Sequence, residues 1–187
     1  MLCCYEASEE SGPVERLQLR DYQLELAEHA VGGKNSIVVA PTGSGKTHVA
    51  LHIAMCHLEA ADLGKVVFLV PTVSLVNQQK EMFSRYFSPT YKTVGVSGDS
   101  PQLSLAGLVP TYDIFVVTPQ ILVDAIKKDF TPIDISIFTL LIFDECHHTD
   151  KGHPYNKVMA DYLDKKLEGD RNLPQVKLIC LVMFHSV

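Results

Sequence analysis

Six short runs of apolar and β-branched residues, separated by segments with apolar residues at helical spacing, constrain the fold of this chain most strongly. The expected strands are residues 36–40, 65–70, 91–96, 113–118, 140–143 and 177–184. Helices are expected between them, at residues 22–31, 46–60, 75–86, 119–128 and 154–167. Most of the runs are continuously apolar, which is typical of strands covered on both faces. The order therefore predicts an α/β fold with a parallel sheet covered by helices on both faces.

The length of the chain fits one folded domain. Its 187 residues, of which 47% are hydrophobic, can bury about 70% of their unfolded surface, enough for one core. Residues 1–16 are polar and are expected to be a flexible lead-in, residues 17–176 the domain, and residues 177–187 a divergent apolar tail that could form a last strand. The apolar runs are too short to span a bilayer, and the N-terminus lacks the basic and apolar segments of a signal peptide. We therefore expect neither a membrane protein nor a secreted one.

The cysteines and the charge balance give weaker indications. An odd number of cysteines does not indicate a disulfide framework, and reduced thiols fit the cytosol or nucleus; they are Cys3, Cys4, Cys56, Cys146 and Cys180. Sixteen Lys and Arg against 22 Asp and Glu give a formal net charge of −6. This sum counts mildly against nonspecific binding of polyanions, but a local basic face remains compatible with it.

A phosphate-binding loop is indicated after the first expected strand. Residues 40–47 read Ala-Pro-Thr-Gly-Ser-Gly-Lys-Thr and lead into a helical pattern. Such glycines let backbone N–H groups point into a concavity at a helix N-terminus, where a phosphate chain binds. Lys46 would reach the β- and γ-phosphates and the Thr47 hydroxyl would ligate Mg²⁺. The expected nucleotide-binding residues of the loop are Thr42, Gly43, Ser44, Gly45, Lys46 and Thr47.

Two competing motifs fail, and one position of the phosphate loop departs from the strict phosphate-loop pattern. Ala40 stands where the strict phosphate loop begins with Gly, which leaves the chemistry unchanged. His48 replaces the third glycine of a dinucleotide-binding fingerprint, and Asp99 interrupts a G-x-S-x-G elbow.

Two adjacent carboxylates end the fifth expected strand. Asp144 and Glu145 directly follow residues 140–143, and carboxylates at that place are unfavourable unless they meet a cation. Asp144 is expected to hold Mg²⁺ and Glu145 to orient and deprotonate an attacking water. A zinc site is the alternative, because four donor side chains lie close together in sequence; they are Cys146, His147, His148 and His153.

These motifs resemble those of a known family. Asp-Glu-Cys-His at 144–147 is similar to the acidic motif of superfamily 2 helicases, and residues 40–47 resemble their first motif. More closely, residues 17–176 resemble the first helicase domain of the RIG-I-like cytosolic RNA receptors, which implies a RecA-like P-loop NTPase fold that uses ATP and Mg²⁺. Residues 19–27 resemble the adenine-reading motif, so Gln23 would bond the adenine edge and Arg20 would pack on its face. The resemblance assigns catalysis to Lys46, Asp144, Glu145 and His147.

The resemblance also implies contacts with the backbone of double-stranded RNA. The residues concerned lie in short polar segments that follow expected strands; they are Pro71, Gln78, Ser97, Gly98, Thr118, Pro119 and Gln120. Short polar side chains and loop N–H groups suit phosphate and 2′-OH recognition. The tract from His153 to Asn156 is family-specific, but the helicase segment of Dicer has a similar one and remains an alternative.

The last eleven residues depart from the family pattern. A Thr-Ala-Ser motif that couples nucleotide state to RNA contact is expected after residues 173–176, but residues 177–187 do not contain it. The second helicase domain, which supplies arginines to the γ-phosphate, is also missing from this sequence. We therefore expect the first domain of a cytoplasmic, ATP-dependent helicase or translocase of innate antiviral RNA sensing, binding nucleotide with little turnover alone. A noncatalytic decoy or interaction fragment is the rival hypothesis.

Overall fold

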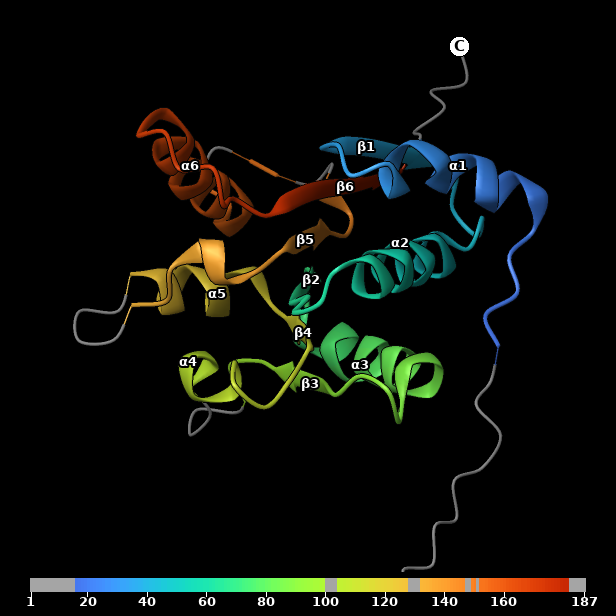
Figure 1. Ribbon diagram of the computed structural model, residues 1–187, viewed down its shortest axis with the longest axis horizontal. Helices are drawn as coiled ribbons and strands as arrows, with labels where there is room; N and C mark the ends of the chain where they lie inside the picture. Colours follow the sequence, from blue (N-terminus) through green and yellow to red (C-terminus); the bar gives the residue numbers. More distant parts are fainter. Residues whose placement is uncertain (1–15, 100–103, 128–131, 147–148, 151, 182–187) are drawn as a thin grey trace, which may run out of the picture.

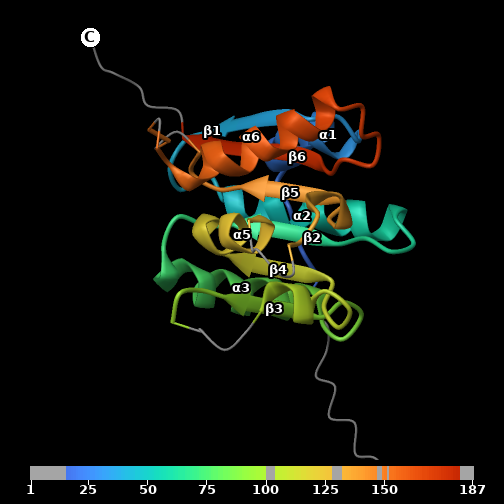
Figure 2. The same cartoon turned by 90° about the vertical axis from the view of Figure 1, so that its left-hand side faces the viewer.

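The computed structural model describes residues 16–99, 104–127, 132–146, 149–150 and 152–181. Within these residues six strands form one parallel sheet in the order β1-β6-β5-β2-β4-β3. Figure 2 shows the strands one above another, from β1 at the top to β3 at the bottom. The strands are β1 (Ser36–Ala40), β2 (Val66–Leu69), β3 (Thr93–Val96), β4 (Ile114–Val117), β5 (Leu140–Phe143) and β6 (Gln175–Leu181).

Helices cover both faces of the sheet, as the sequence predicted (Figure 1). On one face lie α1 (Asp21–Val31), α2 (Lys46–Ala60) and α3 (Val73–Phe87); on the other lie α4 (Leu105–Leu108), α5 (Pro119–Ile126) and α6 (Pro154–Leu167). A short 3-10 helix, η1 (Ile135–Ile137), precedes β5. The central strands β2, β4 and β5 are buried throughout, which explains their continuous apolar sequences. No helix within the described ranges is long and apolar enough to cross a membrane.

Helix α4 and strand β6 are among the elements that differ from the sequence expectation. Helix α4 was not expected, because four residues are too few to show helical periodicity. Strand β6 begins at Gln175, two residues earlier than expected, and contains the buried Lys177. The Lys177 ammonium donates to the Lys34 carbonyl oxygen, and burial lowers the pKa of this amine. A lysine inside an interior strand is unusual, so the sequence analysis placed Lys177 at the start of the strand.

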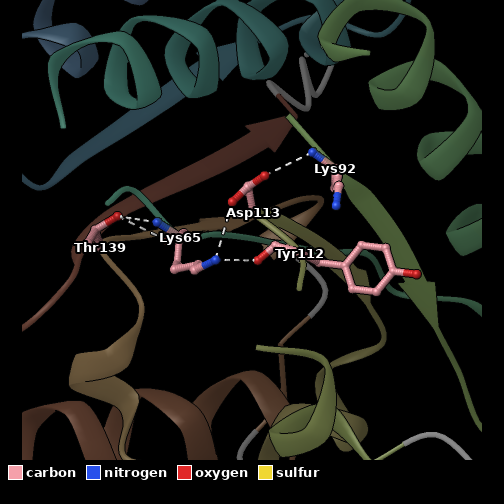
Figure 3. Close-up of polar contacts among 5 residues, drawn as sticks. All are labelled: Lys65, Lys92, Tyr112, Asp113 and Thr139. Carbon is pink, nitrogen blue, oxygen red and sulfur yellow. Dashed lines mark hydrogen bonds and ion pairs between the residues drawn. The ribbon is translucent and has the colours of Figure 1, made fainter. Parts of the chain in front are cut away.

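The amino-terminal ends of four strands are joined by a polar network (Figure 3). Lys65 Nζ donates to the Tyr112 carbonyl oxygen at 2.6 Å and to Asp113 Oδ1 at 3.2 Å. Asp113 Oδ2 accepts from the backbone N–H of Lys92 at 2.9 Å, and Thr139 Oγ1 accepts from the Lys65 N–H at 2.9 Å. Each of Lys65, Lys92, Asp113 and Thr139 directly precedes a strand, so this network aligns the edge opposite the expected site.

Candidate nucleotide and RNA site

The residues expected to be functional leave the sheet at its carboxyl edge. Because every strand pair is parallel, the segments that follow the strands emerge on the same side. The expected phosphate-binding and acidic residues follow β1 and β5, whereas the expected RNA-binding residues follow β2, β4 and β3. The strand order therefore divides this edge into a nucleotide half and an RNA half, which meet where β5 pairs with β2.

The phosphate loop has the backbone geometry of an anion-binding nest. Gly43 and Gly45 both have a φ of +76°, the left-handed region that glycine adopts without strain. A Cβ at Gly43 would meet nothing within 4 Å, so the space beside this glycine is open. The Ser44 hydroxyl is buried without a hydrogen-bond partner, and Lys46 Nζ donates to the Pro41 carbonyl oxygen at 3.3 Å. An unpaired hydroxyl and a weakly held ammonium at a helix N-terminus suit a phosphate ligand.

Helix α1 holds the outer side of this loop. Gln23 Nε2 donates to the Ser44 carbonyl oxygen at 2.9 Å, and Gln23 Oε1 accepts from the Arg20 backbone N–H at 2.9 Å. The Tyr22 hydroxyl donates to the same Ser44 oxygen at 2.8 Å, a contact that the sequence analysis did not anticipate. A Cβ at Gly45 would collide with the Gln23 amide, so close packing as well as its φ favours glycine at this position.

A cavity of about 310 Å³ lies beside the loop, at the lower end of the size range of small-molecule sites. It brings together residues that are far apart in sequence, from the segment before α1 to the start of α2; its lining is Gln18, Arg20, Tyr22, Gln23, Gly43, Ser44, Gly45 and His48. The expected base-reading pair Arg20 and Gln23 therefore shares one cavity with the phosphate loop.

The acidic turn lies within electrostatic reach of the phosphate loop. Burial, together with the Glu145 charge, raises the pKa of Asp144 to about 6, although the Glu145 backbone N–H and the Lys46 charge both act to lower it. Because the Lys46 charge acts on the pKa of Asp144, the ammonium lies within electrostatic range of the carboxyl. Thr47 is half-buried in the first turn of α2. The expected catalytic residue His147 lies outside the described residues.

Cys146 and His153 are engaged in ways that do not favour a zinc site. Cys146 is joined to Cys180 of β6 by a disulfide, with 5.5 Å between their Cα atoms. His153 Nδ1 accepts from the Tyr155 backbone N–H and caps α6. The disulfide contradicts the expectation of reduced thiols for this pair. Its residues are 34 positions apart, and only the pairing of β5 with β6 brings them together.

The expected RNA-binding residues differ in exposure. Pro71, Ser97 and Thr118 follow the adjacent strands β2, β3 and β4, so the structure brings these three segments together. Ser97 and Pro119 are buried, and Pro119 forms the first turn of α5. The exposed members lie on α3, after β3 and on α5; they are Gln78, Gly98 and Gln120. Gln120 Nε2 donates to Asp124 Oδ1 at 2.6 Å.

Comparison with known proteins fixes the family. A sequence model described as DEAD/DEAH box helicase matches residues 20–181. The chain belongs to the DEAD/DEAH box helicase family. Helicase domains of this family bind ATP, generally with Mg²⁺.

Among curated relatives, the helicase domain is similar to the human antiviral innate immune response receptor RIG-I, with 49% identity over 163 residues, 84% of this chain. It is 39% identical over 163 residues to the mouse ATP-dependent RNA helicase DHX58, covering 86% of this chain. Identity to Dicer-like protein 2 of Cryphonectria parasitica is 37% over 167 residues, again 86% of the chain. The chain spans 18%, 24% and 11% of these three proteins, respectively. Similarity to the receptor exceeds similarity to the Dicer-like protein.

Proposed function

We propose that this chain is the ATP-binding first domain of an ATP-dependent double-stranded-RNA helicase or translocase of cytoplasmic antiviral sensing. One observation carries this proposal. The open phosphate loop, the cavity beside it that Arg20 and Gln23 line, and the Asp144 carboxyl lie together at one edge of the sheet. The 49% identity to human RIG-I supports the sensing role. Residues 17–176 are proposed as the nucleotide-binding domain, with residues 177–181 completing its sheet as part of β6.

ATP and Mg²⁺ fit the donor groups that the chain presents. Gly43 and Gly45 form a nest that an anion would fill, and the Ser44 hydroxyl is buried without a partner. In the proposed complex Arg20 and Gln23 bind the base, and the loop from Thr42 to Thr47 binds the phosphates. The Thr47 hydroxyl and the Asp144 carboxylate are hard oxygen ligands of the kind that Mg²⁺ prefers. Bound Mg²⁺ supplies neutralisation of phosphate charge.

The proposed catalytic work of the chain is positioning and proton transfer. Lys46 holds the terminal phosphates, and Glu145, assisted by His147, orients water and accepts its proton. Charge stabilisation by arginines of a second helicase domain is proposed to be required for turnover, because loss of such an arginine typically removes a factor of about 10³ to 10⁵ in rate. The chain alone is therefore proposed to bind nucleotide with little hydrolysis.

The proposed RNA contacts lie on the other half of the same edge. Gln78, Gly98 and Gln120 are exposed, and Pro71 and Thr118 are half-buried, so these five can approach a phosphate backbone. Buried Ser97 is proposed to act through its backbone N–H. Buried Pro119, which has no backbone N–H, is proposed to act through the turn geometry at the start of α5. Backbone contacts of this kind recognise the shape of an RNA duplex.

Thermal melting of the chain with Mg²⁺-ADP tests the nucleotide assignment. A ligand at a hundredfold excess over Kd stabilises the folded state by about 2.7 kcal/mol, so the melting temperature should rise. Lys46→Ala should fold normally and lose this rise. No rise in either protein, with both folded, would contradict the phosphate-loop assignment. RNA-stimulated ATPase activity of the chain and of Lys46→Ala, measured together, separates an enzyme domain from a noncatalytic decoy.

A further inference from the structure

The Tyr155 hydroxyl lies where the nucleotide and RNA halves of the edge meet. It is positioned to donate to the Asp144 carbonyl oxygen at 2.8 Å and to the Leu69 carbonyl oxygen at 3.0 Å. Leu69 is the last residue of β2, and its carbonyl also accepts the Asp144 N–H at 2.9 Å. One hydroxyl on α6 therefore bridges the ends of β5 and β2.

The peptide that Tyr155 contacts also controls the Asp144 carboxyl. The carbonyl of Asp144 and the N–H of Glu145 belong to the same planar peptide unit. This N–H donates to Asp144 Oδ1 at 3.0 Å, so the orientation of the peptide fixes the carboxyl. Glu145 has a φ of +50°, in the left-handed region that is unfavourable for a residue with a side chain. The turn therefore needs an external contact to keep it in place.

Tyr155 is itself rigidly held. Its side chain is only 3% exposed, and its ring packs edge-on against Phe143, with 5.1 Å between the ring centroids. Its backbone N–H donates to His153 Nδ1 at 3.2 Å at the start of α6. Burial, together with the charges of Asp144 and Glu145, raises the pKa of the Tyr155 hydroxyl, so this group remains a donor.

We infer that Tyr155 is a positioning residue for Mg²⁺-nucleotide binding: its hydroxyl fixes the Asp144–Glu145 peptide and thereby aims the Asp144 carboxyl at the metal. The inference rests on the proposed nucleotide-binding function. The inference extends that function by assigning a role to α6, a helix that contributes none of the expected nucleotide or metal ligands.

Tyr155→Phe in the full chain tests this inference, because phenylalanine keeps the ring and removes only the hydroxyl. The matched control is Tyr162→Phe, a second buried tyrosine of α6, whose hydroxyl accepts from Asn35 Nδ2 at 3.0 Å. Calorimetric affinities for ADP are measured with and without Mg²⁺. Tyr155→Phe should weaken Mg²⁺-ADP binding by about fivefold to tenfold, the value of one hydrogen bond, and leave metal-free ADP binding unchanged. Tyr162→Phe should change neither affinity.

A second measurement separates positioning from general stability. In an Asp144→Asn background Tyr155→Phe should cause no further loss of Mg²⁺-dependent affinity, because its effect acts through the carboxyl. Unchanged Mg²⁺-ADP affinity in Tyr155→Phe, an equal loss with and without Mg²⁺, or a full additional loss in the Asn background would each overturn the inference. Absent Mg²⁺-ADP binding by the wild-type chain, or binding unaffected by Lys46→Ala, would instead overturn the proposed function and the inference with it.

Discussion

At the scale of single residues, the charge of Asp144 depends on burial and on two charged neighbours. Desolvation and the Glu145 carboxylate favour the protonated form, while Lys46 favours the ionised form. The resulting pKa of about 6 lies well above the ordinary value of 3.8. A carboxyl that titrates near neutral pH can change charge when a cation arrives, which is typical of functional sites.

The raised pKa of Asp144 predicts opposite pH trends for stability and for metal binding. The folded chain holds the Asp144 proton at pH values where the unfolded chain has lost it, so this group stabilises the fold below about pH 4 and loses that contribution as pH rises through about 6. Mg²⁺ needs the ionised form, so Mg²⁺-dependent ADP affinity should rise through about pH 6. Metal-free ADP affinity in the same buffers is the control, and Asp144→Asn should abolish the rise. A flat profile between about pH 5 and 8 would contradict this prediction.

Residue roles that depend on local motifs could be expected from the sequence, and those that depend on long-range contacts could not. The glycines of residues 43–45 carry their conformational requirement in the sequence, and their positive φ values agree with it. Tyr22 reaches the Ser44 carbonyl across 22 positions, and Tyr155 reaches Leu69 across 86. No periodicity or spacing signals such contacts. A tyrosine next to a recognised motif residue was the available indication for Tyr22.

At the scale of elements, the two edges of the sheet have separate roles. The carboxyl edge holds the candidate site, whereas the amino edge is aligned by the network around Lys65 and Asp113 (Figure 3). The strands themselves were predictable because buried parallel strands are continuously apolar. The start of β6 was not, because Lys177 is satisfied by a carbonyl oxygen that only the folded chain brings near.

The separation of the edges predicts a variant that loses stability and keeps function. Asp113→Asn removes the ion pair with Lys65 and weakens acceptance from the Lys92 N–H. We expect a loss of about 1 to 2 kcal/mol in the free energy of unfolding, measured in urea, with unchanged Mg²⁺-ADP affinity. Lys92→Ala is the control, because Lys92 meets Asp113 through its backbone N–H and carbonyl, which the substitution keeps. Surface substitutions usually change stability by less than about 0.5 kcal/mol. Reduced ADP affinity in folded Asp113→Asn would show that the edges are coupled.

At the scale of the whole molecule, the strand order decides how the two halves of the site are joined. The alternation of strands and helices predicts a parallel sheet, but it does not say which strands are neighbours. The structure inserts β6, the last strand among the described residues, between β1 and β5. The phosphate loop after β1 and the acidic turn after β5 are therefore held in register by a strand from the segment that departs most from the family pattern.

In this arrangement residues 177–181 support the strand that leads into the phosphate loop. All five residues of β1 pair with residues 177–181, from Ser36 with Lys177 to Ala40 with Leu181. Apart from these pairings, β1 has no strand partner in the described part of the sheet.

A chain ended at Val176 loses every strand pairing of β1, so we expect it to lose cooperative thermal unfolding and the stabilisation by Mg²⁺-ADP. A chain ended at Leu181 retains all five pairings and should behave like the full chain in both measurements. Analytical ultracentrifugation of the three chains checks for self-association, because removal of residues 177–181 leaves β1 and β5 with edges open to pairing with another molecule. Equal melting temperatures and equal nucleotide stabilisation for the two shortened chains would contradict the role assigned to β6. Loss of cooperative unfolding and of nucleotide stabilisation in both shortened chains would show that residues after Leu181 are required.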